Sequence, residues 1–357
     1  MTDEELSGGV ERAAAEPLET GSGTTQAMVA AAFTTAEARR KVSLPETAVL
    51  FGVLVLLVVF FSITSQYFLN GANLINILQN TARIGIVACP ATLLLISGQF
   101  DLSVGSISAF VATVTAIAAA TSGAPLTPGL PLWVALLLGV LAALLVGIVN
   151  ATSVTVFRIN ALITTLATLA IFRGLTKVLA DGQTIRLEDF SDLGITRILG
   201  LPIPVYIFAA VVVAFYFILR YTTYGRSMYA IGASPTAARL AGIRTDRAIF
   251  IAFVLSAALA GLSGLILLSQ VGSASVNAGI GLELAVVTAV VLGGASLSGG
   301  RGSIVGTTLA VLIVGVLGNG LIQLGVPSFW IDVAGGVLLL VAVGFDQVRV
   351  RFSSATG

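Results

Sequence analysis

The sequence has no histidine, a single cysteine and few charged residues, and each shortage excludes a class of function. Without histidine, the chain lacks the commonest metal ligand and the commonest proton shuttle in proteins. Its one cysteine, Cys89, cannot form an internal disulfide, and its place beside Pro90 in an apolar stretch indicates a small buried side chain. Only 10% of the 357 residues are charged, and the net charge of +1 provides no field that would recruit nucleic acid.

Apolar side chains, by contrast, are abundant. Hydrophobic residues make up 57% of the chain and its mean hydropathy is +1.03, whereas soluble domains are about half apolar and about a quarter charged. One bilayer crossing uses about 20 residues, so the length allows roughly ten crossings with short loops. We therefore predict an all-α polytopic membrane protein with about ten transmembrane helices and no second globular domain.

Apolar runs of spanning length recur from the end of the polar first 42 residues onward. A crossing helix needs about 20 residues, and several of these runs are shorter. The predicted crossings cover residues 46–64, 82–98, 104–121, 131–153, 160–180, 203–220, 248–269, 283–296, 303–324 and 328–345.

The distribution of basic residues predicts the orientation of these crossings. Residues 1–42 are polar without a sustained apolar period, which predicts a disordered tail, and the basic run 39–41 holds that tail in the cytoplasm. The 220–248 loop is rich in arginine and falls on the same side. Ten crossings place both termini in the cytoplasm. The exception is the 181–202 loop, which is expected outside yet contains two arginines among more numerous acidic residues.

The 220–248 loop contains a predicted short helix. Ser234 is a typical N-cap, Pro235 suits the first helical position, and Gly242 ends the helix after about two turns. Because so short a helix is unstable alone in water, it must pack against something. Two interpretations remain: a linker resting on its own bundle, or a docking helix that transmits a push from a cytoplasmic partner. The candidate docking residues are Ser234, Pro235, Ala237, Ala238, Arg239, Leu240 and Gly242.

Asp101 lies between two apolar runs, in a stretch bracketed by Gly98 and Gly105. This pattern predicts an irregular segment at membrane depth, which is tolerated where protein buries it or where it lines a wet cavity. An ionisable residue at such a depth is costly and is a functional candidate. Alternatively, the Asp101 carboxylate caps the third crossing by accepting the N–H of Ser103 or Val104. The two roles are compatible.

A glycine-rich run at residues 293–302 follows the crossing that begins at Glu283. It lacks the Gly-Lys-Ser/Thr ending of a phosphate-binding loop and no strand precedes it, so nucleotide binding is rejected. The glycines instead permit a tight connection between two crossings. The sequence offers no catalytic residues, no metal ligands and no cofactor-binding site.

Three motifs together resemble the permease family of binding-protein-dependent ABC importers for ribose, xylose, arabinose and galactose. They are Asp101 to Ser106, Tyr224 to Ile243 and Val291 to Gly300, and the similarity covers essentially everything after residue 42. The resemblance implies a type II ABC importer-like carbohydrate permease of the inner (cytoplasmic) membrane, working as a dimer with a second copy or a homologue. It also implies two ATPase subunits that bind ATP and Mg, and an external sugar-binding protein.

Under this resemblance the chain is a transport subunit without enzymatic activity or a cofactor of its own, and the helix at Pro235 is a coupling helix. The predicted domains are the tail 1–42, a transmembrane permease domain 43–347 containing the coupling loop 220–248, and a short cytoplasmic tail 348–357. The chain departs from the family pattern at Gln99-Phe100 and at Asn160-Ala161-Leu162, where solute could pass. Candidate solute-path residues are Phe100, Asp101, Ser103, Ser106, Asn150, Thr164, Thr165, Glu283 and Trp330.

The alternative is an ion-coupled secondary transporter, which would use intramembrane carboxylates or histidines. Only Asp101, Glu283 and Asp332 are available for that role, so we favour the ABC permease. Asp101 and Glu283 each precede a leucine at the start of a crossing rich in small residues. This pattern predicts that they occupy comparable places in two inverted halves of five crossings each.

Overall fold

The structure is a computed structural model that describes residues 46–121, 127–187 and 189–354. The tail predicted at 1–42 lies outside these residues. Helices make up most of the described chain, and its strands are each two residues long. The helices are α2 (Glu46–Thr64), α3 (Gly71–Ile96), α4 (Val104–Ala119), α5 (Leu132–Thr155), α6 (Ala161–Leu179), α7 (Asp192–Ile195), α8 (Ile203–Tyr221), α9 (Thr223–Ala233), α10 (Pro235–Leu240), α11 (Thr245–Val271), α12 (Leu282–Leu292), α13 (Ile304–Gln323) and α14 (Ser328–Ser354). The strands are β1 (Ile185–Arg186), β2 (Arg197–Ile198), β3 (Leu201–Pro202) and β4 (Ser273–Ala274).

Seven of the described helices are long and apolar enough to cross a membrane. Three shorter apolar helices cover Val104–Ala119, Leu282–Leu292 and Ser328–Gly344. Large apolar side chains are exposed along several of the long helices, for example Leu56 on α2 and Leu145 on α5, as expected of surfaces that contact lipid. A mostly helical, multi-pass architecture is therefore confirmed, while the number of crossings stays a prediction.

Helix α3 begins eleven residues earlier than the second predicted crossing, at Gly71 instead of residue 82. Its first half is rich in amides, which lowers the hydropathy of the sequence there. The structure pairs the Asn73 amide with Asn319 and Gln323 of α13, and the Asn70 side chain caps the helix by accepting the N–H of Ala72. Because these polar groups find partners inside the protein, they do not prevent a helix in an apolar bundle.

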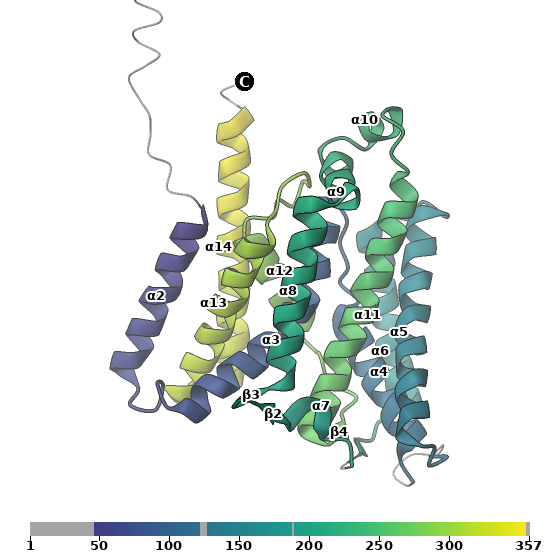
Figure 1. Cartoon of the computed structure of the whole chain (residues 1–357), viewed down its shortest axis with the longest axis vertical. Helices are drawn as coiled ribbons and strands as arrows, with labels where there is room; N and C mark the ends of the chain where they lie inside the picture. Colours follow the sequence, from purple (N-terminus) through teal and green to yellow (C-terminus); the bar gives the residue numbers. More distant parts are fainter. Residues whose placement is uncertain (1–45, 122–126, 188, 355–357) are drawn as a thin grey trace, which may run out of the picture. The chain divides into compact units, whose positions relative to one another are not determined.

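The bundle has two distinguishable ends (Figure 1). Helix α10 lies at one end, hereafter the α10 end, and α7 lies with β2, β3 and β4 at the other, the α7 end. At the α7 end, strand β1 pairs antiparallel with β4 and β2 with β3. The 181–202 loop is therefore folded into short strands and a helical turn, which the sequence did not predict.

Two helices, α4 and α12, each follow an irregular segment instead of a tight turn. Residues 97–103 join α3 to α4, and residues 275–281 join β4 to α12. The two helices run in opposite directions, since α4 ends among the core residues around β1 and β4 at the α7 end, and α12 leads into the loop at the α10 end. Their entries touch, because a Cβ added to Gly105 would overlap the Gly279 carbonyl and the Glu283 carboxylate.

Arg173 contributes to the same junction. Its Nη1 donates to the Ala278 carbonyl oxygen at 2.5 Å, which ties α6 to the 275–281 segment.

Glycines bring three parts of the chain together at the α10 end. The Gly300 N–H, in the loop between α12 and α13, donates to the Ile96 carbonyl at the end of α3 at 2.8 Å. Gly232 of α9 fits against the same two residues. The glycine-rich run is thus a tight connection, as predicted, and Gly299 and Gly300 have positive φ angles of 82° and 75°. Helix α9 was not predicted; its Thr222 cap accepts the Gly225 N–H.

The contact at Gly232 yields a stability prediction. A Cβ at this position would overlap the backbone of Ile96 and Gly300, which cannot move aside as a side chain can. We expect Gly232→Ala to lower the free energy of unfolding by about 1–3 kcal/mol. Gly318→Ala is the matched control, because a Cβ added to that helical glycine would meet no atom within 4 Å and alanine favours helix by about 1 kcal/mol. Thermal unfolding in detergent measures both; equal stability of the two variants would contradict the packing.

Candidate functional site

A buried network of hydroxyl, amide and carboxylate groups surrounds Asp101. Its Oδ1 accepts the backbone N–H of Ser103 at 3.0 Å and the Ser103 hydroxyl at 2.5 Å. Its Oδ2 accepts the Ser256 hydroxyl of α11 at 2.7 Å. Asn150 of α5 donates its amide to the Ser103 hydroxyl at 2.8 Å. All four side chains are buried, so the network ties the irregular 97–103 segment to two long helices.

The predicted capping role of Asp101 is confirmed, because the carboxylate accepts the Ser103 N–H just before α4 begins. The network leaves one group unpaired: the Asn150 Oδ1 is buried without a hydrogen-bond partner among the described residues. Buried polar groups normally have a partner, which can be water or a ligand. The orphaned Asn150 acceptor could therefore take a hydrogen bond from a water or a bound donor.

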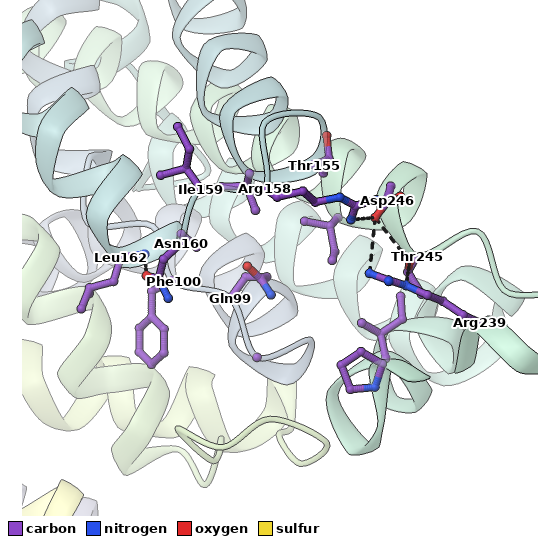
Figure 2. A pocket seen from close by; sticks show the side chains of 16 residues that line it. Gln99, Phe100, Thr155, Arg158, Ile159, Asn160, Leu162, Arg239, Thr245 and Asp246 are labelled. Atoms are coloured by element: carbon purple, nitrogen blue, oxygen red, sulfur yellow. Dashed lines mark hydrogen bonds and ion pairs between the residues drawn. The ribbon is translucent and has the colours of Figure 1, made fainter. Parts of the chain in front are cut away.

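A pocket of about 460 Å³ opens between this segment and the α10 end. Its lining includes Gln99, Phe100, Asn160 and Leu162; in Figure 2, Arg239 and Asp246 lie on the opposite side of the view from Phe100 and Leu162. Both departures from the family pattern thus line one cavity. Asn160 also has a structural role there, because its Oδ1 caps α6 by accepting the N–H of Leu162 at 2.9 Å.

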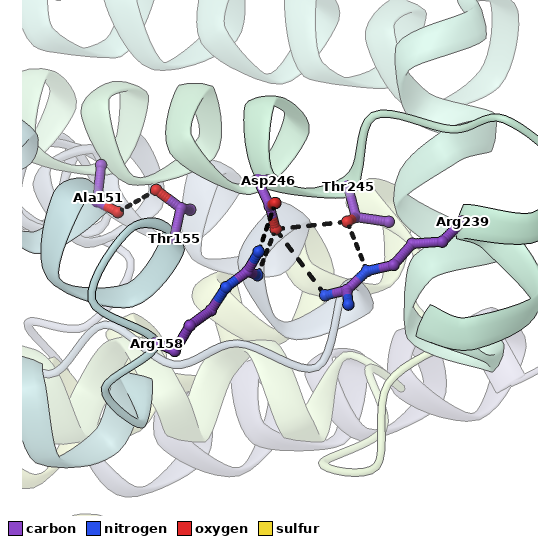
Figure 3. A network of polar contacts seen from close by, with 6 residues as sticks. All are labelled: Ala151, Thr155, Arg158, Arg239, Thr245 and Asp246. Carbon is purple, nitrogen blue, oxygen red and sulfur yellow. Dashed lines mark hydrogen bonds and ion pairs between the residues drawn. The ribbon is translucent and has the colours of Figure 1, made fainter.

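An ion-pair network lies at the edge of this pocket (Figure 3). Arg158, between α5 and α6, donates through both terminal nitrogens to the Asp246 carboxylate at 2.7 and 2.8 Å. These hydrogen bonds raise the pKa of the Arg158 guanidinium above its ordinary value. Arg239 of α10 donates from Nε to the Thr245 hydroxyl at 3.1 Å and lies 3.9 Å from Asp246. The connection between α5 and α6 and helix α10 therefore both contact the first turn of α11.

The Arg158–Asp246 pair is solvent-screened, since the two side chains are 56% and 44% exposed. Exposed ion pairs contribute little to stability. Its bidentate geometry instead fixes orientation, holding the connection between α5 and α6 against α11.

Helix α10 has the capping predicted from its sequence. The Ser234 hydroxyl accepts the Ala237 N–H at 3.2 Å, Pro235 begins the helix, and Gly242 follows with φ 81°. Ala238, one of the candidate docking residues, is only 3% exposed and packs against its own bundle. Leu240 is 85% exposed and carries the outward apolar surface instead.

The remaining predicted path residues are not gathered in the pocket. The Ser106 and Thr165 hydroxyls donate to carbonyls in their own segments, Ser103 and Ala161. Thr164 is buried, and its hydroxyl has no hydrogen-bond partner within the described part of the chain. Trp330 is 57% exposed near the start of α14. Glu283 lies at the α4–α12 junction, and its buried Oε2 likewise has no hydrogen-bond partner in the residues described.

One residue that sequence reasoning missed is Arg83. It sits within the apolar run of α3, its Nη2 donates to Asn80 Oδ1 at 3.3 Å, and its Nε is buried without a partner among the described residues. A cation inside a predicted crossing was the available signal. No group of three or more potential metal ligands occurs within the described ranges.

Comparisons with known proteins point to one family. Residues 73–343 match the family described as branched-chain amino acid transport system / permease component. The ribose import permease protein of Bacillus subtilis is 38% identical over 300 residues, covering 83% of this chain and 91% of that protein. The L-arabinose transport system permease protein of Escherichia coli K12 is 38% identical over 306 residues, covering 84% and 91%. The ribose import permease protein of Escherichia coli K12 is 36% identical over 315 residues, covering 87% and 96%. No solved structure matches.

The Asp101 network predicts a graded loss of stability. Asp101→Ala leaves the Ser103 N–H and two hydroxyls without their acceptor, so we expect the free energy of unfolding to fall by roughly 2 kcal/mol. Ser256→Ala removes one donor and should cost about half as much. Asp332→Ala, an exposed carboxylate in α14, is the control and should change little. Thermal unfolding of the purified permease measures all three, and an Asp101→Ala variant as stable as the Asp332→Ala variant would refute the network.

Proposed function

This chain belongs to the branched-chain amino acid transport system / permease component family, and from its relatives named for ribose and arabinose we propose that it carries a monosaccharide or related polar solute through the membrane. The chain is a permease subunit of an ABC importer and not itself an enzyme. The observation that carries the sugar assignment is the similarity, over most of both chains, to relatives named for ribose and arabinose. The ABC assignment is favoured over the ion-coupled alternative on the same grounds.

The proposal includes partners and an orientation. Permease components of ABC importers work with an ATPase subunit and a binding protein, and ATP and Mg would bind the ATPase. A second copy of this permease, or a homologue, would complete the pore. The α10 end carries the arginine-rich 220–248 loop, so it is assigned to the cytoplasm together with both termini. The transmembrane permease domain would span residues 43–347.

The proposed solute path passes the Asp101 network and the adjoining pocket. The pocket volume of about 460 Å³ lies within the range of small-ligand sites. Its lining combines the Phe100 ring, suited to the apolar face of a sugar, with the Gln99 amide, suited to hydroxyls. The Asn150 acceptor and Glu283 Oε2 are further unpaired polar atoms along this route. Thr164, Thr165, Ser106 and Trp330 stay proposed path residues with weaker support.

Two inverted halves are part of the same proposal. Helices α4 and α12 both start inside the bundle after an irregular segment, run in opposite directions and meet at Gly105 and Gly279. Asp101 precedes the first helix and Glu283 lies in the first turn of the second. This juxtaposition supports the pairing of the two carboxylates, because inverted repeats place binding sites where such broken helices meet.

We assign α10 as the element that couples the permease to its ATPase. It is capped at both ends, packed through Ala238 and linked through Arg239 to the start of α11. A push on the exposed Leu240 would therefore reach α11, which carries Ser256 of the Asp101 network. Nucleotide bound to the ATPase can shift the pore between two states only if the ATPase contacts those states differently.

The docking assignment predicts that Leu240→Asp abolishes coupling. A charge on the outward apolar side chain of α10 should prevent seating in a groove of the ATPase, while the fold is unaffected because Leu240 is 85% exposed. Leu199→Asp is the matched control: that leucine is 94% exposed in the β2–β3 turn at the α7 end. The measurement is ATP hydrolysis by the complete transporter, with and without loaded binding protein. If loaded binding protein stimulates ATP hydrolysis normally in the Leu240→Asp variant, α10 is a linker and not a docking helix.

The sugar assignment is tested with the same assay. Pentoses, hexoses, polyols and branched-chain amino acids are each presented with the binding protein, and stimulated ATP hydrolysis and uptake are recorded. We expect one or a few monosaccharides to stimulate both. Stimulation by amino acids alone would overturn the sugar proposal and leave the ABC assignment intact.

A further inference from the structure

Helix α3 carries a row of polar side chains on one face of its first half. Asn76, Asn80 and Arg83 follow one another at spacings of four and three residues, which places them on the same side of a helix. Asn76 and Asn80 are exposed and Arg83 is half-buried. Leu74, two residues from Asn76, is 40% exposed on a different face. These three polar side chains therefore share one face, whereas Asn73 and Gln79 lie elsewhere on the helix and are paired with α13 and with the Gly194 carbonyl.

Arg83 lies well inside the bundle and not at its rim. Its carbonyl accepts the Ser263 hydroxyl of α11 at 3.3 Å. Ser263 precedes the end of α11 at Val271 by two helical turns, which at 1.5 Å per residue is about 12 Å from the α7 end of that helix. Two residues further along α3, Gly85 contacts the Phe208 ring of α8. The Arg83 backbone is thus held at the depth of apolar helices, and its side chain reaches back toward the α7 end to Asn80, one turn earlier.

The charge of Arg83 has no acidic partner among the described residues, where its one side-chain contact is the neutral Asn80. Its Nε is buried and unpaired. An arginine facing hydrocarbon in this way is costly, and charged residues in crossings normally face a water-filled path or pair with another group. Two exposed amides on the same face would be equally unfavourable against lipid. The face is consistent with water and solute, not lipid, beside it.

We propose that the Asn76, Asn80 and Arg83 face of α3 forms part of the wall of the solute path in its α7-end half, and that Arg83 selects solutes by charge. This inference rests on the proposed transport function and adds a specificity residue to it. Arg83 offers N–H donors that match hydroxyl and carboxylate oxygens and repels cations. Neutral polyhydroxy solutes and sugars bearing a carboxylate pass this position, and amino sugars carrying a positive charge are disfavoured.

Thiol labelling tests the wall directly. In a Cys89→Ala background, Asn76→Cys, Asn80→Cys and the control Leu74→Cys are treated in proteoliposomes or cells with membrane-impermeant methanethiosulfonates. These reagents are attacked by the thiolate, which forms in water. A cysteine on a wet path should therefore react about tenfold faster than one facing lipid. The complete transporter is used, but the readout requires no transport. Labelling of Asn80→Cys no faster than of Leu74→Cys would overturn the proposal.

The charge role of Arg83 is tested by comparing an anionic 2-sulfonatoethyl with a cationic 2-trimethylammonioethyl reagent on Asn80→Cys. A neighbouring unit charge should favour the anionic reagent by roughly fivefold over the ratio seen with a free thiol. Arg83→Gln should remove this preference and Arg83→Lys should retain it, which separates charge from loss of folding. An unchanged ratio in Arg83→Gln would refute the charge role.

A third experiment asks whether solutes protect Asn80→Cys from labelling. Neutral and carboxylate-bearing sugars should slow labelling of Asn80→Cys when supplied with the binding protein, and amino sugars should not. Protection by amino sugars equal to that by neutral sugars would contradict the selectivity. If labelling and charge preference hold but no sugar is taken up, the proposed solute class fails and the wall assignment stands.

Discussion

The structure depends on one constraint: polar groups that lie at membrane depth must find their partners inside the protein. The chain breaks its helices there twice, at residues 97–103 and 275–281, and such breaks expose backbone and side-chain polar groups. The Asp101 carboxylate satisfies three donors around the first break. At the second, Arg173 donates to the Ala278 carbonyl. Glycine at positions 105 and 279 lets the two breaks touch, so each shields the other from lipid.

From this junction the contacts lead toward the α10 end. Ser256, which donates to Asp101, belongs to α11, and the first turn of that helix carries Thr245 and Asp246. These two residues bind Arg239 and Arg158, and so join α10 and the start of α6 to α11. One helix therefore connects α10, whose Leu240 is exposed, to the buried carboxylate. The pocket is lined by Gln99 and Phe100 and also by residues of α10 and α11. A small displacement of either helix would therefore change its shape.

The sequence predicted the apolar helices closely, because hydropathy and capping residues act locally. The bounds expected for the helices beginning near Glu46 and Ile203 match the structure within a residue. It failed where partners come from elsewhere in the chain: the Asn73 amide near the start of α3 is paired by α13 residues some 250 positions away, and Arg83 inside a mostly apolar run was overlooked. Asp101 was identified from its position, but not Ser256, since a serine on an apolar helix carries no local signal. The burial of Ala238 likewise depends on tertiary packing.

We infer that Asp101 acts as an acceptor organising a broken helix, in an importer driven by ATP, and does not carry protons. Asparagine has the same shape, can accept the Ser103 N–H and can donate to Ser256, but cannot ionise. The decisive measurement is uptake of labelled sugar by the Asp101→Asn transporter in proteoliposomes, with ATP supplied to the ATPase side and no ion gradient. We predict that Asp101→Asn retains most of the ATP-driven uptake of the unmodified protein. Loss of uptake in a correctly folded variant, or uptake driven by an ion gradient without ATP, would contradict it.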